Sequence, residues 1–98
     1  MPLIALNDDK LETAAEVFKG FGNPIRIRII DALQLNDLRV MELSEKLGYS
    51  QPIISQQLKI LKSAGIVHKV KDGRSSRYAL SNHHYSDMIK CMRGCLGI

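Results

Sequence analysis

The feature that most constrains the fold is a change of hydrophobic period after Gly65. Before this point apolar residues recur every three or four positions, which predicts amphipathic helices. Beyond it, residues 66–70 alternate, an Asp-Gly turn signal lies within residues 71–76, and residues 77–80 form a second short run, which together predict a β-hairpin. A chain of 98 residues has room for one domain. We therefore expect a single, mainly α-helical domain over residues 1–98 with one small β-hairpin.

Four helices are predicted before the hairpin and one after it. Asn7 or Asp8 can cap the first, which ends near residue 19, and Asn23-Pro24 starts the second. A short third helix covers about residues 40–47, and Gly48 ends it. Ser50 caps a fourth helix that runs to about residue 64, and the last helix covers about residues 83–95. The predicted order is α-α-α-α-β-β-α.

Charge is distributed unevenly along the chain. Residues 1–49 carry 6 basic and 8 acidic side chains, a net charge of −2, whereas residues 50–98 carry 8 basic and 2 acidic ones, a net charge of +6. Between residues 59 and 77, six lysines and arginines accompany a single acidic residue, Asp72. A compact basic segment of this kind indicates either a polyanion-binding surface or a solvated basic face.

The third and fourth helices with the tight turn between them form a predicted helix-turn-helix over about residues 40–64, and the hairpin at about residues 66–80 is the predicted wing. In the fourth helix Ile53, Ile54, Leu58 and Leu61 are expected to face inward. Gln and Ser side chains near the start of such a helix can bond to base edges, the lysines can meet phosphates, and an arginine at the hairpin tip can enter the minor groove. The predicted DNA-binding residues are Ser50, Gln51, Ser55, Gln56, Gln57, Lys59, Lys62, Lys69, Lys71, Arg74 and Arg77. A helical protein-interaction module with a solvated polar face is the alternative.

The same segments resemble the ArsR/SmtB repressors. Residues 22–30, GNPIRIRII, resemble the family's G-[NH]-P-x-R-x-x-I segment, and residues 41–51, MELSEKLGYSQ, resemble its E-L-A-x-x-L-G-L-S-Q stretch. Residues 55–67, SQQLKILKSAGIV, are similar to its S-x-H-L-K-x-L-x-x-A-G-L-V recognition helix, with Gln57 in place of the frequent His. The resemblance covers about residues 13–92 and implies a winged helix-turn-helix repressor that an inducer releases from its operator.

The resemblance also implies a homodimer, built on the first and last helices, that binds a roughly twofold-symmetric double-stranded operator. Two recognition helices about 34 Å apart would then meet successive turns of the major groove. The candidate interface residues, which intramolecular packing could equally explain, are Leu11, Val17, Phe18, Met88, Ile89 and Met92.

The metal sites of the family are only partly matched. Many relatives hold thiophilic metals in a C-V-C box of the third helix, but Arg39 and Met41 stand where its thiolates would be. Arginine is no metal ligand and a thioether is a poor one for zinc, so that site is absent. Thiol sensors that pair cysteines of the second and last helices have a second-helix position that Asp31 fills here.

The last helix offers the remaining candidate site. His84, Asp87, Cys91 and Cys95 are spaced three, four and four residues apart, which places them on one helical face. In relatives that bind metal between paired last helices, His84 matches a ligand while Asn82 replaces an acidic one. Three interpretations stay open: a site for zinc or another thiophilic metal ion at His84, Cys91 and Cys95, a thiol switch at the cysteines, or no sensing role. No cofactor is assigned beyond this.

An enzyme is not expected. The chain contains no P-loop, G-x-S-x-G, H-E-x-x-H or dinucleotide-binding motif. Two neighbouring cysteines do not make the disulfide framework of a secreted protein, the N-terminus lacks the basic flank of a secretion signal, and no apolar run approaches about 18 residues. We therefore expect a cytoplasmic protein without a membrane partner.

Overall fold

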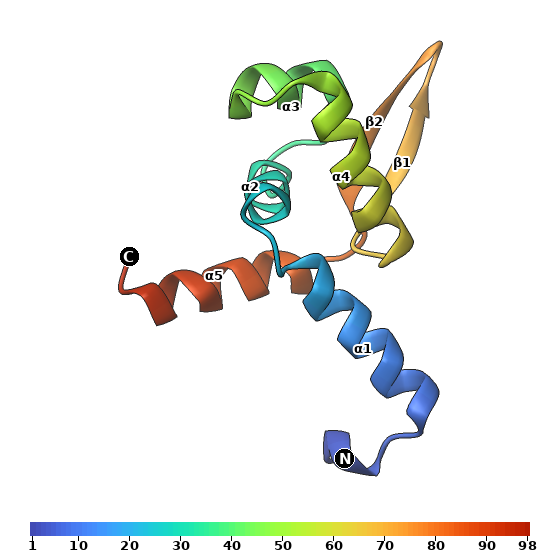
Figure 1. Cartoon of the computed structure of the whole chain (residues 1–98), viewed down its shortest axis with the longest axis vertical. Coiled ribbons are helices and arrows are strands. Elements are labelled where there is room, and N and C mark those ends of the chain that lie inside the picture. Colours follow the sequence, from blue (N-terminus) through green and yellow to red (C-terminus); the bar gives the residue numbers. More distant parts are fainter.

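The computed structural model describes residues 1–98 and confirms the predicted order of helices and hairpin (Figure 1). A short 3₁₀ helix, η1, which the sequence patterns do not predict, precedes the first α-helix. The elements are η1 (Leu3–Ala5), α1 (Asp8–Gly20), α2 (Pro24–Ala32), α3 (Val40–Leu47), α4 (Gln51–Ser63), β1 (Val67–Asp72), β2 (Ser75–Leu80) and α5 (His84–Leu96). None of the helices is both long and apolar enough to cross a membrane.

Side-chain caps determine where three of the helices begin. Asn7 accepts a hydrogen bond from the backbone N–H of Lys10 at the start of α1, and Asn23 accepts from the backbone N–H groups of Ile25 and Arg26 at the start of α2. Ser50 caps α4 in the same way. These caps satisfy N–H groups that have no partner within the helix, so the helix starts follow directly from local sequence.

The hydrophobic core lies between α2, α3, α4, the start of the hairpin and the middle of α5. Its eleven buried residues are Phe21, Ile29, Ile30, Leu33, Leu43, Ile54, Leu58, Leu61, Ile66, Val67 and Ile89. Ile53, expected to face inward, is 39% exposed, because residue 54 already occupies the inward position of that turn of α4. Burial of this cluster supplies the main driving force for folding.

The hairpin is tighter than its sequence predicts. β1 and β2 pair antiparallel from Val67↔Leu80 to Asp72↔Ser75, which leaves only Gly73 and Arg74 in the turn. Gly73 has a φ of +67°, a conformation that glycine adopts without strain in two-residue hairpin turns. Residues 71, 72, 75 and 76, expected in a loop, therefore belong to the strands.

A third short strand segment, absent from the sequence predictions, joins the hairpin at its base. Leu38 forms an isolated antiparallel bridge with Tyr78, and the two residues exchange backbone hydrogen bonds of 3.0 and 2.8 Å. Because Leu38 lies just before α3, this bridge ties the hairpin to the beginning of the helix-turn-helix.

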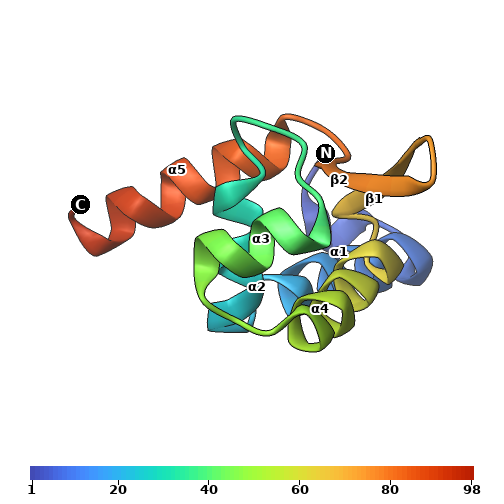
Figure 2. The ribbon, with the colours of Figure 1, turned by 90° about the horizontal axis from the view of Figure 1, so that it is seen from above.

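The two terminal helices extend away from this body. Figures 1 and 2 both show the C-terminal end of α5 pointing away from α4 and the hairpin, and Figure 1 shows the N-terminal end of α1 reaching away from α2. The junction of α1 and α2 contacts the start of α5 through Phe21 and Tyr85, whose ring centroids lie 6.3 Å apart. Both helices carry exposed apolar side chains, including Phe18 near the C-terminal end of α1 and Leu96 at the C-terminal end of α5.

Candidate nucleic-acid interface

The turn before α4 is fixed by local hydrogen bonds. Gly48 ends α3 with a φ of +80°, and the Ser44 hydroxyl donates a 2.5 Å hydrogen bond to the backbone carbonyl of Tyr49. The Ser50 hydroxyl then accepts a 3.4 Å hydrogen bond from the backbone N–H of Ile53. The direction in which α4 leaves α3 is consequently set by contacts within ten residues of sequence.

Helix α4 has two distinct faces. Its inner face is anchored in the core by Ile54, Leu58 and Leu61, which are at most 1% exposed. Its outer face is solvent-accessible, as predicted, and with the cap it presents Ser50, Gln51, Ser55, Gln56, Lys59 and Lys62. The helix thus holds hydrogen-bonding and cationic side chains on a rigid support.

Gln57 differs from the other predicted DNA-binding residues of α4 because it lies at the edge of the outer face, and its contact with DNA stays a prediction. It is half-buried, and its Oε1 accepts a 2.9 Å hydrogen bond from Nη1 of Arg26 in α2. The same guanidinium donates 3.0 Å bonds to the carbonyl oxygens of Gly20 and Lys19 at the end of α1. The helical spacing could have predicted this half-buried position, because residue 57 lies three residues after Ile54 and four before Leu61, at the edge of the buried face.

The predicted wing residues divide into free and paired side chains. Lys69, Lys71 and Arg74 are exposed, with Arg74 in the turn itself. Arg77 is instead half-buried, and its Nε lies 3.6 Å from Oδ2 of Asp72 and has no hydrogen-bond acceptor. Arg77, which is also predicted to bind DNA, therefore has an acidic partner within the hairpin, and its contact with DNA stays a prediction.

Arg39 is a residue of this surface that sequence reasoning missed. It immediately precedes α3, and its guanidinium donates hydrogen bonds of 2.6 Å to Asp72 Oδ2 and 2.5 Å to Ser75 Oγ. These partners are 33 and 36 residues away in sequence, so no local pattern identifies them. The Arg39 hydrogen bond and the charge of Arg77 lower the pKa of the Asp72 carboxyl below its ordinary value of 3.8.

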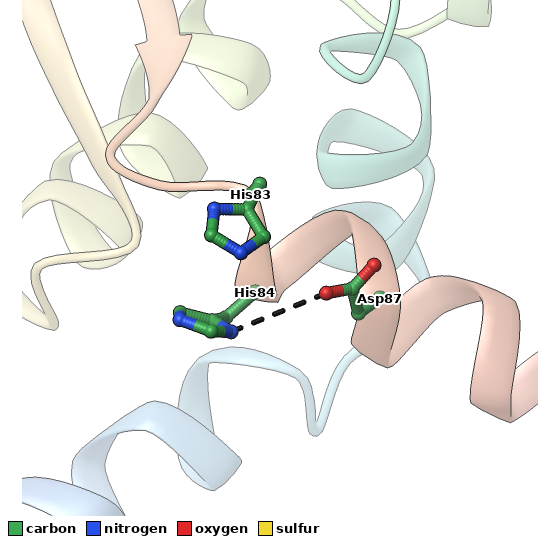
Figure 3. A group of neighbouring side chains, drawn as sticks. All are labelled: His83, His84 and Asp87. Atoms are coloured by element: carbon green, nitrogen blue, oxygen red, sulfur yellow. Dashed lines mark ion pairs between the residues drawn. The ribbon is translucent and has the colours of Figure 1, made fainter.

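A second cluster of polar side chains lies at the start of α5, on a different element from the basic surface (Figure 3). His83, His84 and Asp87 are exposed, and one potential ligand atom from each lies within 4.8 Å of the others. Nδ1 of His84 is 4.0 Å from Oδ2 of Asp87, and the centroids of the two imidazole rings are 4.1 Å apart. Helical spacing predicts that His84 and Asp87 share a face, but it assigns no role to His83.

The cysteines of α5 lie further along the helix. Cys91 and Cys95 are both free and exposed. With a rise of about 1.5 Å per residue, Cys91 begins about 10 Å along the helix from His84, and Cys95 lies further still. One chain therefore does not bring the three predicted ligands together, and a site that uses all of them needs a second chain.

The candidate interface residues are not equally available. Leu11 and Phe18 are 36% and 66% exposed, whereas Val17, Met88 and Met92 are partly buried against the core. Ile89 is 4% exposed and belongs to the core, which favours the alternative of intramolecular packing for this residue. A side chain already buried within one chain has little area left for a partner.

Known proteins share the sequence pattern of these helices. The model of the bacterial regulatory proteins of the arsR family matches residues 23–69, which include α2, α3 and α4. The uncharacterized HTH-type transcriptional regulator MJ1325 of Methanocaldococcus jannaschii is 40% identical over 83 residues, covering 84% of this chain and 93% of that protein. The HTH-type transcriptional repressor SmtB of Mycobacterium tuberculosis is 38% identical over 79 residues, covering 81% of this chain. The match spans only 58% of the length of that repressor.

A solved structure shows the same architecture. The homodimeric winged helix-turn-helix DNA-binding domain Mb0332 from Mycobacterium bovis superposes with a TM-score of 0.83 at 23% sequence identity, covering 95% of this chain and 89% of that one. The predicted winged helix-turn-helix fold is thereby confirmed.

Proposed function

The chain belongs to the arsR family of bacterial regulatory proteins, and from this premise we propose that it is a sequence-specific DNA-binding transcriptional repressor that acts as a homodimer. The observation that carries the proposal is the pair of faces of α4. Its inner face is fixed in the core, and its outer face presents glutamine, serine and lysine side chains to solvent.

These side chains suit the two tasks of a recognition helix. Gln51, Ser55 and Gln56 occupy the first two turns of α4, where recognition helices contact base edges, and their amides and hydroxyl both donate and accept hydrogen bonds. Lys59 and Lys62 follow toward the C-terminal end and supply cations for phosphates. The exposed Arg74 at the turn of the hairpin would enter the minor groove beside them.

The dimer is part of the same proposal. The exposed Leu11 and Phe18 of α1 and Leu96 of α5 leave apolar area that one chain does not cover. A twofold pairing through these helices would place two copies of α4 about one turn of DNA apart and match an operator of roughly twofold symmetry. The domain from Mycobacterium bovis, which shares this fold, is homodimeric, and this supports the assignment.

Selection from a random double-stranded DNA pool tests this function directly. We expect enrichment of an inverted repeat, and we expect its affinity to fall steeply with salt, because several phosphate contacts release counterions. The control variant Leu35→Ala should select the same repeat with the same salt dependence, since Leu35 is 89% exposed in the segment after α2. Absence of an enriched repeat together with a flat salt dependence would favour the protein-interaction module instead.

A finer part of the proposal is that an inducer bound at α5 weakens operator binding. His83, His84 and Asp87 offer two imidazoles and a carboxylate, which fit zinc and similar divalent ions, and the exposed Cys91 and Cys95 fit a softer ion or a thiol-reactive inducer. Three donors fall one short of a closed tetrahedral zinc site, so water or the second chain would supply the fourth. A bound ion would supply positive charge there and link the donors of paired α5 helices.

Metal titration of the reduced dimer, with and without the selected operator, separates the alternatives. For metal sensing we expect zinc, cobalt or nickel to weaken operator binding in the wild type and to lose this effect in His84→Ala, with His68→Ala in β1 as the control. For thiol sensing we expect an oxidant or arsenite to act and Cys91→Ser with Cys95→Ser to abolish the response. If neither class of inducer changes operator affinity, α5 has no such role.

A further inference from the structure

The hairpin is attached to the helix-turn-helix at two separate places. At its base, the Leu38–Tyr78 backbone bridge joins β2 to the segment before α3. Near its tip, the Arg39 side chain reaches Asp72 and Ser75. Tyr78 and Ser75 are three residues apart on β2, so the two attachments are separated by about 10 Å along the strand.

Arg39 is well placed to hold the tip. Its backbone N–H donates a 2.9 Å hydrogen bond to Oε1 of Glu42, which fixes its main chain at the start of α3. Its guanidinium then bonds to Asp72, the last residue of β1, and to Ser75, the first residue of β2. Only Gly73 and Arg74 lie between these two partners, so the guanidinium of Arg39 bonds to both strands at the positions next to the turn.

Asp72 carries a negative charge on the basic surface that is proposed to bind DNA. It is the only acidic residue between positions 59 and 77, and it lies two positions from the exposed Arg74. A free carboxylate there would repel phosphates, yet Arg39 at 2.6 Å and Arg77 at 3.6 Å flank it from two sides. The presence of Asp72 is explained if its charge serves an internal contact rather than DNA.

We propose that Arg39 and Asp72 form a wing anchor that fixes the tip of the hairpin against α3 and so determines where Arg74 meets DNA. The inference rests on the proposed DNA-binding function and adds two positioning residues to it. Neither residue needs to touch DNA, because both act through the hairpin. The surface that binds DNA thus combines α4 with a wing held at a fixed angle.

The Asp72→Asn variant distinguishes the wing anchor from simple repulsion of phosphates, because the two predict opposite changes in operator affinity. If Asp72 merely repels phosphates, its neutralisation raises affinity for the selected operator. The wing anchor instead predicts that affinity falls by about three- to fivefold, as expected for loss of an exposed charged contact, although the protein has become more positive. Asp37→Asn removes an equal charge from a residue without an ion pair, and we expect it not to lower affinity.

A double-mutant cycle with Arg74→Ala tests whether Arg39 and Asp72 change DNA affinity through Arg74. We expect Asp72→Asn and Arg39→Gln each to lose most of their effect when Arg74 is already alanine, because the wing anchor acts through that side chain. Arg39→Lys should not restore binding, since an ammonium group cannot bond to both strands as the guanidinium does. Effects of Arg39 and Arg74 that simply add would indicate that Arg39 contacts phosphate itself and would overturn the proposal.

A measurement without DNA separates this proposal from the proposed function. In heteronuclear NOE experiments we expect the amides of Gly73 and Arg74 to become more mobile in Arg39→Gln and Asp72→Asn but not in Arg93→Gln, which alters an exposed arginine of α5. Unchanged mobility in both anchor variants would overturn the wing anchor. If the wild type binds no DNA while the tip loosens as expected, the proposed function fails and the contact between hairpin and α3 stands.

Discussion

Helix α4 and the hairpin are positioned by contacts within one chain, whereas parts of α1 and α5 are left largely uncovered. Leu58 and Leu61 of α4 are at most 1% exposed, and the hairpin is tied to α3 at its base and near its tip. Phe18 in α1 and Leu96 in α5 are 66% and 69% exposed, and the candidate ligands of α5 all face solvent. The difference teaches that contacts within one chain complete the proposed DNA-binding surface, whereas the proposed dimer and inducer surfaces require a second chain.

The largest effect should come from the inner face of α4. Leu58→Ala leaves a cavity in the core, and we expect it to lower the free energy of unfolding by about 2–5 kcal/mol in chemical denaturation. Ile60→Ala, on the same helix but at a residue 37% exposed, is the matched control and should cost less than about 1 kcal/mol. Equal losses would mean that the two faces of α4 are not as different as described.

The next effect distinguishes two neighbouring glutamines. Gln56→Ala removes a side chain from the outer face, and we expect it to reduce discrimination at one base pair by about 1–3 kcal/mol while the folded protein keeps its stability. Gln57→Ala removes the acceptor of Arg26, and we expect about 1 kcal/mol of lost stability instead. Binding-site selection and thermal denaturation of both variants check this, and loss of discrimination in Gln57→Ala alone would reverse the assignment.

A smaller effect is expected for the exposed apolar side chains of α1. Phe18→Ala should leave the unfolding of the isolated chain nearly unchanged and weaken dimerisation by about 1–2 kcal/mol, because the ring is 66% exposed in one chain and would lose this exposure in the proposed dimer. Analytical ultracentrifugation measures the dimer dissociation constant, with Leu35→Ala as the exposed apolar control. A dimer of unchanged affinity would place the interface away from α1.

The smallest effect concerns acid. Because Arg39 and Arg77 lower the pKa of Asp72 in the folded protein, the stabilising contribution of this carboxylate is present above the ordinary value of 3.8 and is lost as the pH falls through the lower folded pKa. We therefore expect wing order to be constant from neutral to mildly acidic pH. NMR titration of the Asp72 carboxyl carbon should give a midpoint below 3.8 in the wild type and closer to that value in Arg39→Gln. Identical midpoints would contradict the contact.

Much of the fold follows from local sequence because local interactions determine it. Asn7, Asn23 and Ser50 cap helices at the predicted places, and Gly48 ends α3 through its positive φ. The change of period after residue 65 predicts the hairpin, although its strands are longer than the alternation suggests. Each of these signals acts within about four residues along the chain.

The features that the sequence did not predict depend on contacts between distant segments. The Leu38–Tyr78 bridge, the Arg39–Asp72 pair and the Arg26–Gln57 bond join residues between 31 and 40 positions apart. The charge pattern identifies Asp72 as the one acidic residue of a basic segment, but it does not predict that Arg39 is its partner. For α5, helical spacing groups His84 with the cysteines, whereas the structure places His83 beside it, because the ring of a residue at the helix start can fold over its neighbour.

The guanidinium of Arg26 has one further consequence. Its hydrogen bonds to Lys19, Gly20 and Gln57 join the end of α1 to the middle of α4 through a single planar group. Helix α1 therefore cannot tilt without either breaking one of these bonds or moving α4 with it. In the proposed homodimer, this contact would couple the angle between the two subunits to the orientation of their α4 helices.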